Sequence, residues 1–281
     1  MLLWFRIVEW KNLPWVDRDK NWTKWGKQMA EQNKNPIQVA GRLFGAMEYL
    51  AEHGASNLMD VADALELNKS TAHRILTSLQ YMGYVRQREE DSRYELSYKI
   101  VHLSSQVISR MDIIARVRPC LRKLMESSGE TVHFVKREGA EVVYVDKVES
   151  TRNAFHMVSQ IGSRIPVYRS GVGKAIAATM EEKNVARLWQ ESQIVRVTPY
   201  TITDYTDFLH ELDEVRSRGY ALDNEENEVG VRCIAASLDL PGCPSEYAFS
   251  ISAPVGRMDN DRIAALARDV LAAKREIETT I

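Results

Sequence analysis

The sequence predicts an α+β fold with an N-terminal winged helix-turn-helix domain, a linker helix and a C-terminal domain of strands and helices. Three observations predict it. Three short amphipathic helical segments and a two-stranded hairpin follow one another within residues 35–97. A further helical pattern occupies residues 98–128 with an expected interruption near Pro119, and its first part, residues 98–115, is the predicted linker helix. From residue 116 to residue 281, strands, among them one expected at residues 155–160, alternate with helices. This order favours a sheet covered by helices over a doubly wound nucleotide-binding fold.

The three helices of residues 35–97 have apolar residues at helical spacing and recognisable ends. The first follows Ile37 and stops at Gly54, a residue type that commonly terminates helices. The second is short. The third begins after Asn68, whose side chain can cap the first turn, and stops at Gly83. Two alternating strands around a polar turn complete the order of a winged helix-turn-helix.

The third helix and the hairpin form a local basic surface. Residues 69–88 contain four Lys or Arg residues and no Asp or Glu, although the chain has a net charge of −2. Short and cationic side chains on a helix can reach base edges in the major groove, and a basic hairpin can reach phosphates. The alternative is a solvated charged face on a small helical bundle. We expect double-stranded operator DNA to be bound through its bases by Ser70, Thr71, His73 and Arg74, and through its phosphates by Lys69, Arg86 and Arg88.

One winged domain makes few DNA contacts, so specific binding normally needs two half-sites related by protein symmetry. A homodimer or a dimer of dimers is therefore expected. The linker helix has more apolar residues than one contact face against a small domain needs. We expect it to pack against a partner chain through Ile100, Val107, Ile108 and Met111.

Composition limits the remaining classes of protein. The three cysteines, Cys120, Cys233 and Cys243, form no C-x-x-C pair, which argues against a disulfide framework or zinc finger and favours the cytoplasm. No apolar run is long enough for a membrane span, so no membrane partner is expected. Residues 1–34 contain five of the six tryptophans without a helical or strand period. We interpret this segment as foreign to the fold, with translation beginning at Met29; a tryptophan-rich arm packing on a partner is the alternative.

Several separated motifs resemble the IclR family of transcriptional regulators. Residues 68–76 with 83–85 resemble its DNA-binding signature, and residues 223–236 resemble its signature at the effector site. Residues 161–166 and 170–175 also match, so the resemblance covers roughly residues 36–278. It implies a GAF-like effector-binding domain whose small carboxylate ligand alters operator affinity. Control of a catabolic operon, as a repressor or as an activator, is the expected role. Residues 130–133 and 224–226 are most similar to regulators of sugar-acid and keto-sugar-acid catabolism.

The resemblance also implies positions for an effector site. An anion needs converging hydrogen-bond donors, and the start of a helix supplies backbone N–H groups. Two serines spaced two apart on a strand face the same side. The transferred positions are the backbone of Gly171 and Val172, with Asp223, Cys233, Ser250 and Ser252. Because Asp223 would repel a carboxylate, we expect it to accept a hydrogen bond from a ligand hydroxyl or a backbone N–H. We expect Met157, Ile165 and Val231 to add the apolar wall that small-molecule pockets usually have.

Other chemistries have weaker support. Cys233 and Asp223 could join a histidine in an enzyme, but none of the six histidines lies in a catalytic or metal-binding motif, so no catalytic residue, metal or cofactor is expected. Residues 171–174 resemble a phosphate loop, but Tyr168 occupies the position of its first glycine. Cys233 could be a core residue, Ser250 and Ser252 ordinary strand residues, and Gly171 and Gly173 a close helix-packing site. A protein-interaction module without DNA is a further alternative.

Overall fold

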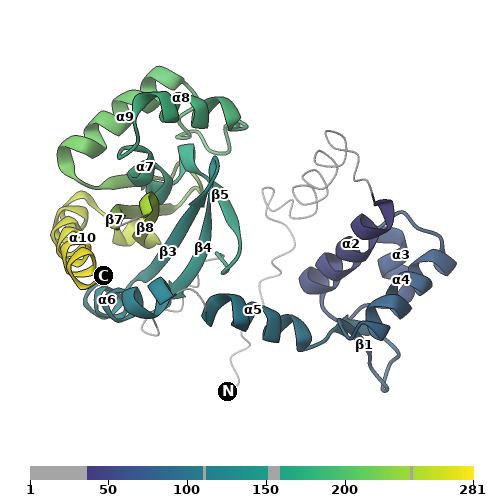
Figure 1. The fold of residues 1–281 in the computed structure, drawn as a ribbon. Helices are drawn as coiled ribbons and strands as arrows, with labels where there is room; N and C mark the ends of the chain where they lie inside the picture. The colour runs from purple at the N-terminus through teal and green to yellow at the C-terminus, as the bar shows by residue number, and fades with distance from the viewer. Residues whose placement is uncertain (1–36, 110–111, 151–158, 241–242) are drawn as a thin grey trace, which may run out of the picture. The chain divides into compact units, whose positions relative to one another are not determined.

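The computed structural model describes residues 37–109, 112–150, 159–240 and 243–281, and the chain divides into two units, residues 1–107 and 108–281. The predicted tryptophan-rich extension, Met111 and Met157 lie outside the described residues. The first unit has the predicted order of three helices and a hairpin (Figure 1). Its elements are α2 (Gln38–His53), α3 (Leu58–Ala64), α4 (Lys69–Tyr81), β1 (Val85–Gln87) and β2 (Tyr94–Leu96).

Local side-chain caps define the helix ends of this unit. Asn57 and Asp60 form a reciprocal capping box at the start of α3. The Asn68 side chain accepts a hydrogen bond of 2.8 Å from the Thr71 backbone N–H at the start of α4, as predicted. Gly54 follows α2 with a φ of 71°, a conformation that glycine adopts at little cost. The helix ends are therefore determined by short-range chemistry.

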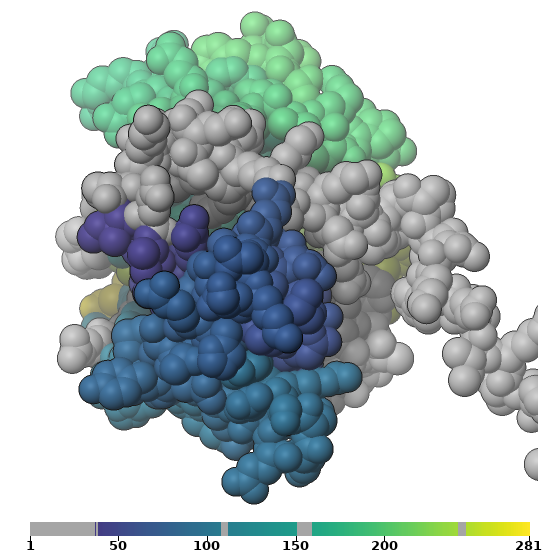
Figure 2. Space-filling view, turned by 90° about the vertical axis from the view of Figure 1, so that its right-hand side faces the viewer, coloured from purple at the N-terminus to yellow at the C-terminus, as the bar shows by residue number. Residues whose placement is uncertain are grey.

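A small apolar core holds the first unit together. The buried face of α4 contributes Ile75, Leu76 and Leu79, which pack with residues from α2, α3 and the hairpin. Tyr94 on β2 is also buried there, and its backbone pairs with Ser56 before α3. Figure 2 shows the atoms of this unit, coloured purple to blue, facing the viewer. Burial of one face of α4 leaves its opposite face to solvent.

The predicted linker region contains two helices, α5 (Lys99–Ser109) and α6 (Asp112–Ser128). We expected an interruption near Pro119, and that expectation was wrong because α6 continues through this proline. A proline removes one backbone hydrogen bond, here to the carbonyl of Ala115. Both residues are exposed, so water can solvate that carbonyl, while buried Val117 and Leu121 hold the helix on the core.

The second unit is a six-stranded antiparallel sheet with helices on both faces, which confirms the predicted α+β class. Its strand order is β5-β4-β3-β8-β7-β6. The strands are β3 (Thr131–Glu138), β4 (Glu141–Val148), β5 (Arg164–Pro166), β6 (Ala221–Asn224), β7 (Val231–Leu240) and β8 (Cys243–Pro254). The helices are α7 (Gly171–Ala177), α8 (Glu182–Glu191), α9 (Tyr205–Arg218) and α10 (Asn260–Thr280).

The two faces of the sheet bury different cores. One face packs Phe134, Ile234 and Phe249 against α6 and α10. The other packs Val135 and Ala235 against α7, α8 and α9, which lie on the opposite side of the sheet in Figure 1. Neighbouring residues of one strand therefore belong to opposite cores, as the two-residue period of a strand requires.

Two short strands were not expected from the sequence. β5 and β6 are the edge strands of the sheet, with three and four residues. A strand was expected at residues 155–160, of which 155–158 lie outside the described residues and 159–160 are not in a strand. Across the described ranges, no helix combines the length and apolar character that a membrane span requires.

Candidate functional site

The exposed face of α4 carries the residues expected to contact DNA. Lys69, Ser70, His73 and Arg74 are exposed, whereas Thr71 is half-buried. Apolar residues on the opposite face of α4 fix it to the rest of the first unit. The helix therefore presents short and cationic side chains on one accessible side, as a helix that enters a DNA groove requires.

The cations of α4 and of the hairpin differ in their partners. Arg86 pairs with Glu95 at 2.6 Å, and Arg88 pairs with Glu90 at 2.9 Å, all within the β1–β2 region. Within the described ranges, no ion pair involves Lys69 or Arg74. Lys69 and Arg74 are therefore available for phosphates or bases, whereas Arg86 and Arg88 would have to exchange a protein carboxylate for DNA.

In the second unit, eight residues expected at the effector site line one cavity of about 220 Å³. They come from β5, α7, β6, β7 and β8, which are widely separated in sequence. The antiparallel register explains their convergence, because Asp223 lies opposite Cys233 and Cys233 lies opposite Ser252. The eight residues are Ile165, Gly171, Val172, Asp223, Val231, Cys233, Ser250 and Ser252.

The cavity has further polar lining that the sequence interpretation missed. His133 lies opposite Ser250 on the neighbouring strand, and its ring nitrogens contact Ser252 Oγ at 3.2 Å and Ser159 Oγ at 2.7 Å. Burial lowers the pKa of His133 to about 3, so the imidazole is neutral and offers one donor and one acceptor. The other additional lining residues are Tyr144, Ser159, Ser163, Ser170, Asn227 and Glu228.

The start of α7 forms one wall of the cavity. Ser170 precedes the helix, and its Oγ accepts a hydrogen bond of 3.2 Å from the Gly173 N–H. A Cβ on Gly171 would lie 3.2 Å from the Asp223 backbone nitrogen, so β6 approaches the helix closely. A Cβ on Gly173 would lie 2.3 Å from the Val167 carbonyl oxygen, which identifies this glycine as a close-packing position.

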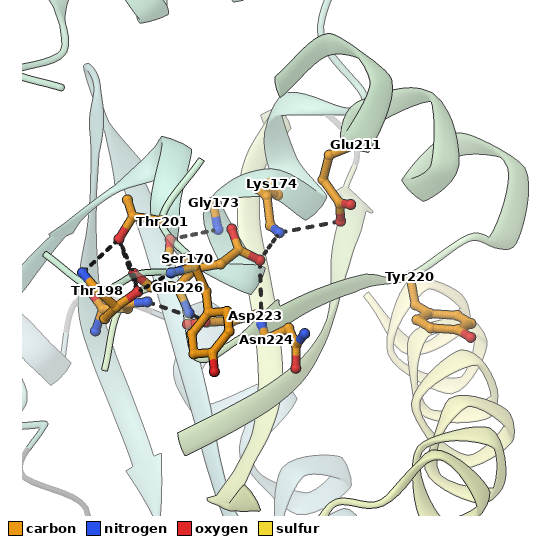
Figure 3. Close-up of polar contacts among 12 residues, drawn as sticks. Ser170, Gly173, Lys174, Thr198, Thr201, Glu211, Tyr220, Asp223, Asn224 and Glu226 are labelled. Carbon is orange, nitrogen blue, oxygen red and sulfur yellow. Dashed lines mark hydrogen bonds and ion pairs between the residues drawn. The ribbon is translucent and has the colours of Figure 1, made fainter. Parts of the chain in front are cut away.

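Behind this wall, buried and half-buried charges connect α7, α9 and the loop that follows β6 (Figure 3). Lys174 Nζ lies 2.5 Å from Glu226 Oε1 and 3.3 Å from Glu211 Oε1. Arg218 completes the network by pairing with Glu211 at 2.8 Å. In a phosphate loop the lysine reaches toward the phosphates of a nucleotide, whereas Lys174 forms a buried ion pair with Glu226.

The same loop is attached to its surroundings through backbone atoms. Asp223 Oδ1 accepts hydrogen bonds from the backbone N–H groups of Glu226, at 2.8 Å, and Asn227, at 3.3 Å. The Thr201 hydroxyl donates to the Glu226 carbonyl at 2.8 Å, and Thr198 lies beside it (Figure 3). Asp223 therefore holds the turn of the loop while it lines the cavity.

Burial shifts the pKa values of several titratable groups of the cavity toward their neutral forms. Burial and the nearby charge of Glu226 raise the pKa of Asp223 to about 7. Burial also raises the pKa of the Cys233 thiol well above its ordinary value. Because the thiolate is the reactive form of cysteine, Cys233 is poorly suited to be a nucleophile. The lining therefore offers a ligand hydroxyl, thiol, carboxyl and imidazole groups beside an apolar wall of Ile165, Val172 and Val231.

Comparison with known proteins covers both units. Residues 39–89 match the family model of the IclR helix-turn-helix domain, and residues 105–279 match that of the bacterial transcriptional regulator IclR C-terminal domain. The chain is 32% identical to the transcriptional repressor IclR of Escherichia coli over 244 residues, which covers 86% of this chain and 89% of that protein. These families and relatives are transcriptional regulators, not enzymes.

Solved structures share the fold. The Thermotoga maritima IclR protein, known from a crystal structure, is 30% identical in sequence with a TM-score of 0.74. The match covers 84% of this chain and 96% of that one. An IclR homologue from Microbacterium hydrocarbonoxydans, solved as a complex with 4-hydroxybenzoate, is 19% identical with a TM-score of 0.73, and the match covers 86% of this chain and 98% of that one. The second likeness concerns the fold alone.

Proposed function

Because the chain belongs to the IclR family of bacterial transcriptional regulators, we propose that its cavity binds a small organic carboxylate and that this binding changes operator affinity. The observation that carries the proposal is the convergence of eight lining residues from five separate elements on one cavity. The helix-turn-helix domain binds double-stranded DNA. A catabolic operon is the proposed target.

The cavity favours a small ligand. Pockets for drug-sized molecules typically have volumes of about 300–1,000 Å³. A cavity of about 220 Å³ is smaller, which suits an acid of modest size. Ser250 and Ser252 would donate hydrogen bonds, as would the backbone at the start of α7, and Ile165, Val172 and Val231 would contact the carbon skeleton. Sugar acids, keto acids and aromatic acids are the proposed classes.

The proposed DNA contacts follow from the exposed face of α4. Ser70, Thr71, His73 and Arg74 are assigned to bases, and Lys69, Arg86 and Arg88 to phosphates. Exposure of Arg74 and its lack of an ion pair within the described chain support its assignment. A homodimer or dimer of dimers would present two such helices to two half-sites.

Coupling between the two functions requires a ligand that prefers one of two conformations. We assign this conformational change to the loop of residues 223–230, since Asp223 both lines the cavity and accepts hydrogen bonds from the backbone of that loop. The helix α5 would transmit the change to the spacing of paired α4 helices. Exposed apolar residues on α5, Val101, Leu103 and Val107, support its packing against a partner chain.

Thermal denaturation with gluconate, pyruvate and 4-hydroxybenzoate tests ligand binding. An acid at a hundred times its dissociation constant is expected to stabilise the protein by about 2.7 kcal/mol. Ile165→Trp would fill the cavity and abolish this stabilisation, whereas Ile161→Trp, on an exposed residue outside the lining, would retain it. Equal stabilisation of both variants would place the ligand elsewhere.

A mobility-shift titration with DNA from upstream of the protein's own gene tests the coupling. The expected result is specific binding whose affinity changes when the stabilising acid is added. Tight binding of the acid with unchanged operator affinity at saturation would contradict the coupling. Absence of DNA binding at low salt, with and without the acids, would favour a protein-interaction module instead.

A further inference from the structure

The charge of the cavity is unusual for a site that receives an anion. Asp223 and Glu228 line it, and among the described lining residues there is no Lys or Arg. His133 is neutral because burial lowers its pKa to about 3. Burial also raises the pKa of the Tyr144 hydroxyl and of Cys233, so neither adds an anionic charge. The acidic groups of the lining therefore determine how a carboxylate can enter.

The nearest buried cation is already used. Lys174 is 1% exposed and pairs with Glu226 and Glu211, while Arg218 pairs with Glu211. Figure 3 shows Lys174 between Glu226 and Glu211. With Arg218, two cations thus meet two carboxylates, and this four-residue network is balanced without Asp223. A negative charge on Asp223 has no dedicated counter-ion in the network.

Asp223 has one carboxyl oxygen left for a ligand. Its Oδ1 accepts both hydrogen bonds from the loop, and in the described chain no hydrogen bond reaches Oδ2. The residue is 5% exposed and lines the cavity. Its Oδ2 is therefore the atom that can meet the carboxylate of a bound acid.

Two carboxylates in one buried site cannot both ionise at little cost, and such a pair commonly shares one proton. We propose that the effector acid binds with uptake of one proton from solvent, which Asp223 and the ligand carboxylate then share in a single hydrogen bond. This inference rests on the proposed function, since it requires that a carboxylate occupies this cavity. It makes Asp223 a ligand-contacting residue and makes effector affinity dependent on pH.

The direction of that dependence follows from the state of the free protein. Burial and Glu226 raise the pKa of Asp223 to about 7, with Lys174 and the loop N–H groups acting in the opposite direction. Below that pH, Asp223 already carries the proton and binding takes up none. Above it, only the protonated fraction is competent, so affinity at pH 8 should be about tenfold weaker than at pH 6.

Isothermal titration calorimetry of the full chain measures the proton directly. Gluconate, pyruvate and 4-hydroxybenzoate are titrated at pH 6 and pH 8, each in two buffers with different ionisation enthalpies. The slope of the binding enthalpy against buffer ionisation enthalpy gives the number of protons taken up. We expect a number close to one at pH 8 and close to zero at pH 6.

Asp223→Asn keeps an oxygen acceptor for the loop but cannot ionise. Its proton uptake at pH 8 should be close to zero, and its affinities at pH 6 and pH 8 should be equal. Binding by the unsubstituted protein at pH 8 without proton uptake would overturn the inference, and this measurement does not depend on the variant. Uptake that persists in Asp223→Asn and disappears in Glu228→Gln would also overturn it, because Glu228 would then be the acceptor.

Failure of the proposed function gives a different result. None of the three acids would bind at either pH, or binding would be insensitive to Ile165→Trp. In either case the carboxylate is not in this cavity, and the inference fails with the proposal. Binding that Ile165→Trp removes, without proton uptake at pH 8, supports the proposed function and rejects only the shared proton.

Discussion

Lys174 and Glu226 form an ion pair inside the C-terminal domain, with Nζ 2.5 Å from Oε1 and both residues buried. The pair joins α7 to the loop that follows β6, and both elements line the cavity. Burial of two charges is costly unless they are paired and hydrogen-bonded. The pair therefore specifies how the wall of the cavity is assembled, and its disruption should affect the whole domain.

Lys174→Met should destabilise the protein by about 3–5 kcal/mol, because it leaves Glu226 buried without its cation. Urea denaturation of the full chain measures the change. Lys183→Met removes an exposed ion pair with Glu181 and is the matched control, with an expected change of about 1 kcal/mol or less. The double variant Lys174→Met/Glu226→Gln should recover part of the lost stability. No recovery would mean that the loss comes from packing instead of charge.

Asp223→Asn should change how stability depends on pH. The pKa of Asp223 is about 7 in the folded protein and about 3.9 in an unfolded chain, so the folded state holds the proton more tightly. The contribution of this proton on Asp223 to the free energy of unfolding is complete below about pH 4 and is lost as the pH rises to about 7. Asp223→Asn avoids this loss, and its stability relative to the unsubstituted protein should rise over that window by about 4 kcal/mol at most.

Urea denaturation at several pH values between 4 and 8 measures this difference. Asp213→Asn, on the exposed side of α9, is the control because its side chain is 70% exposed. A stability difference for Asp223→Asn that stays constant across the window would show that Asp223 ionises in the folded protein as it does in the unfolded chain.

Gly173→Ala should destabilise the C-terminal domain by about 1–3 kcal/mol. Its Cβ would lie 2.3 Å from the Val167 carbonyl oxygen and 2.5 Å from the Val167 Cα, so backbone has to move. Gly256→Ala is the control, since its Cβ would have nothing within 4 Å. Thermal denaturation compares the two, and equal stability would mean that α7 can shift freely.

Arg74→Ala should weaken binding to the specific operator by about 1–3 kcal/mol if Arg74 contacts a base. Arg88→Ala should weaken binding to all sequences and reduce the salt dependence of binding. Both effects should be smaller than for loss of an unpaired cation, because Arg88 already pairs with Glu90. Mobility-shift titrations at several salt concentrations distinguish the two effects. Arg187→Ala on α8 is the control, and a similar loss in all three variants would contradict a base contact by Arg74.

Several features of the fold could be predicted because they depend on neighbouring residues. Asn68 as a helix cap, Gly54 as a helix end and the basic face of α4 are properties of one short segment. The common face of Ser250 and Ser252 follows from the period of a strand. The expected helical break at Pro119 was wrong because packing of α6 on the core outweighs one missing hydrogen bond.

The sequence by itself determined the helix ends, the strand periods and the family motifs, because each depends on residues close together in the chain. Only the tertiary structure decided that His133 lies beside Ser252 and that Lys174 meets Glu226. These contacts join residues 119 and 52 positions apart. Sheet register and helix packing bring such residues together, and both are set by burial of the whole domain.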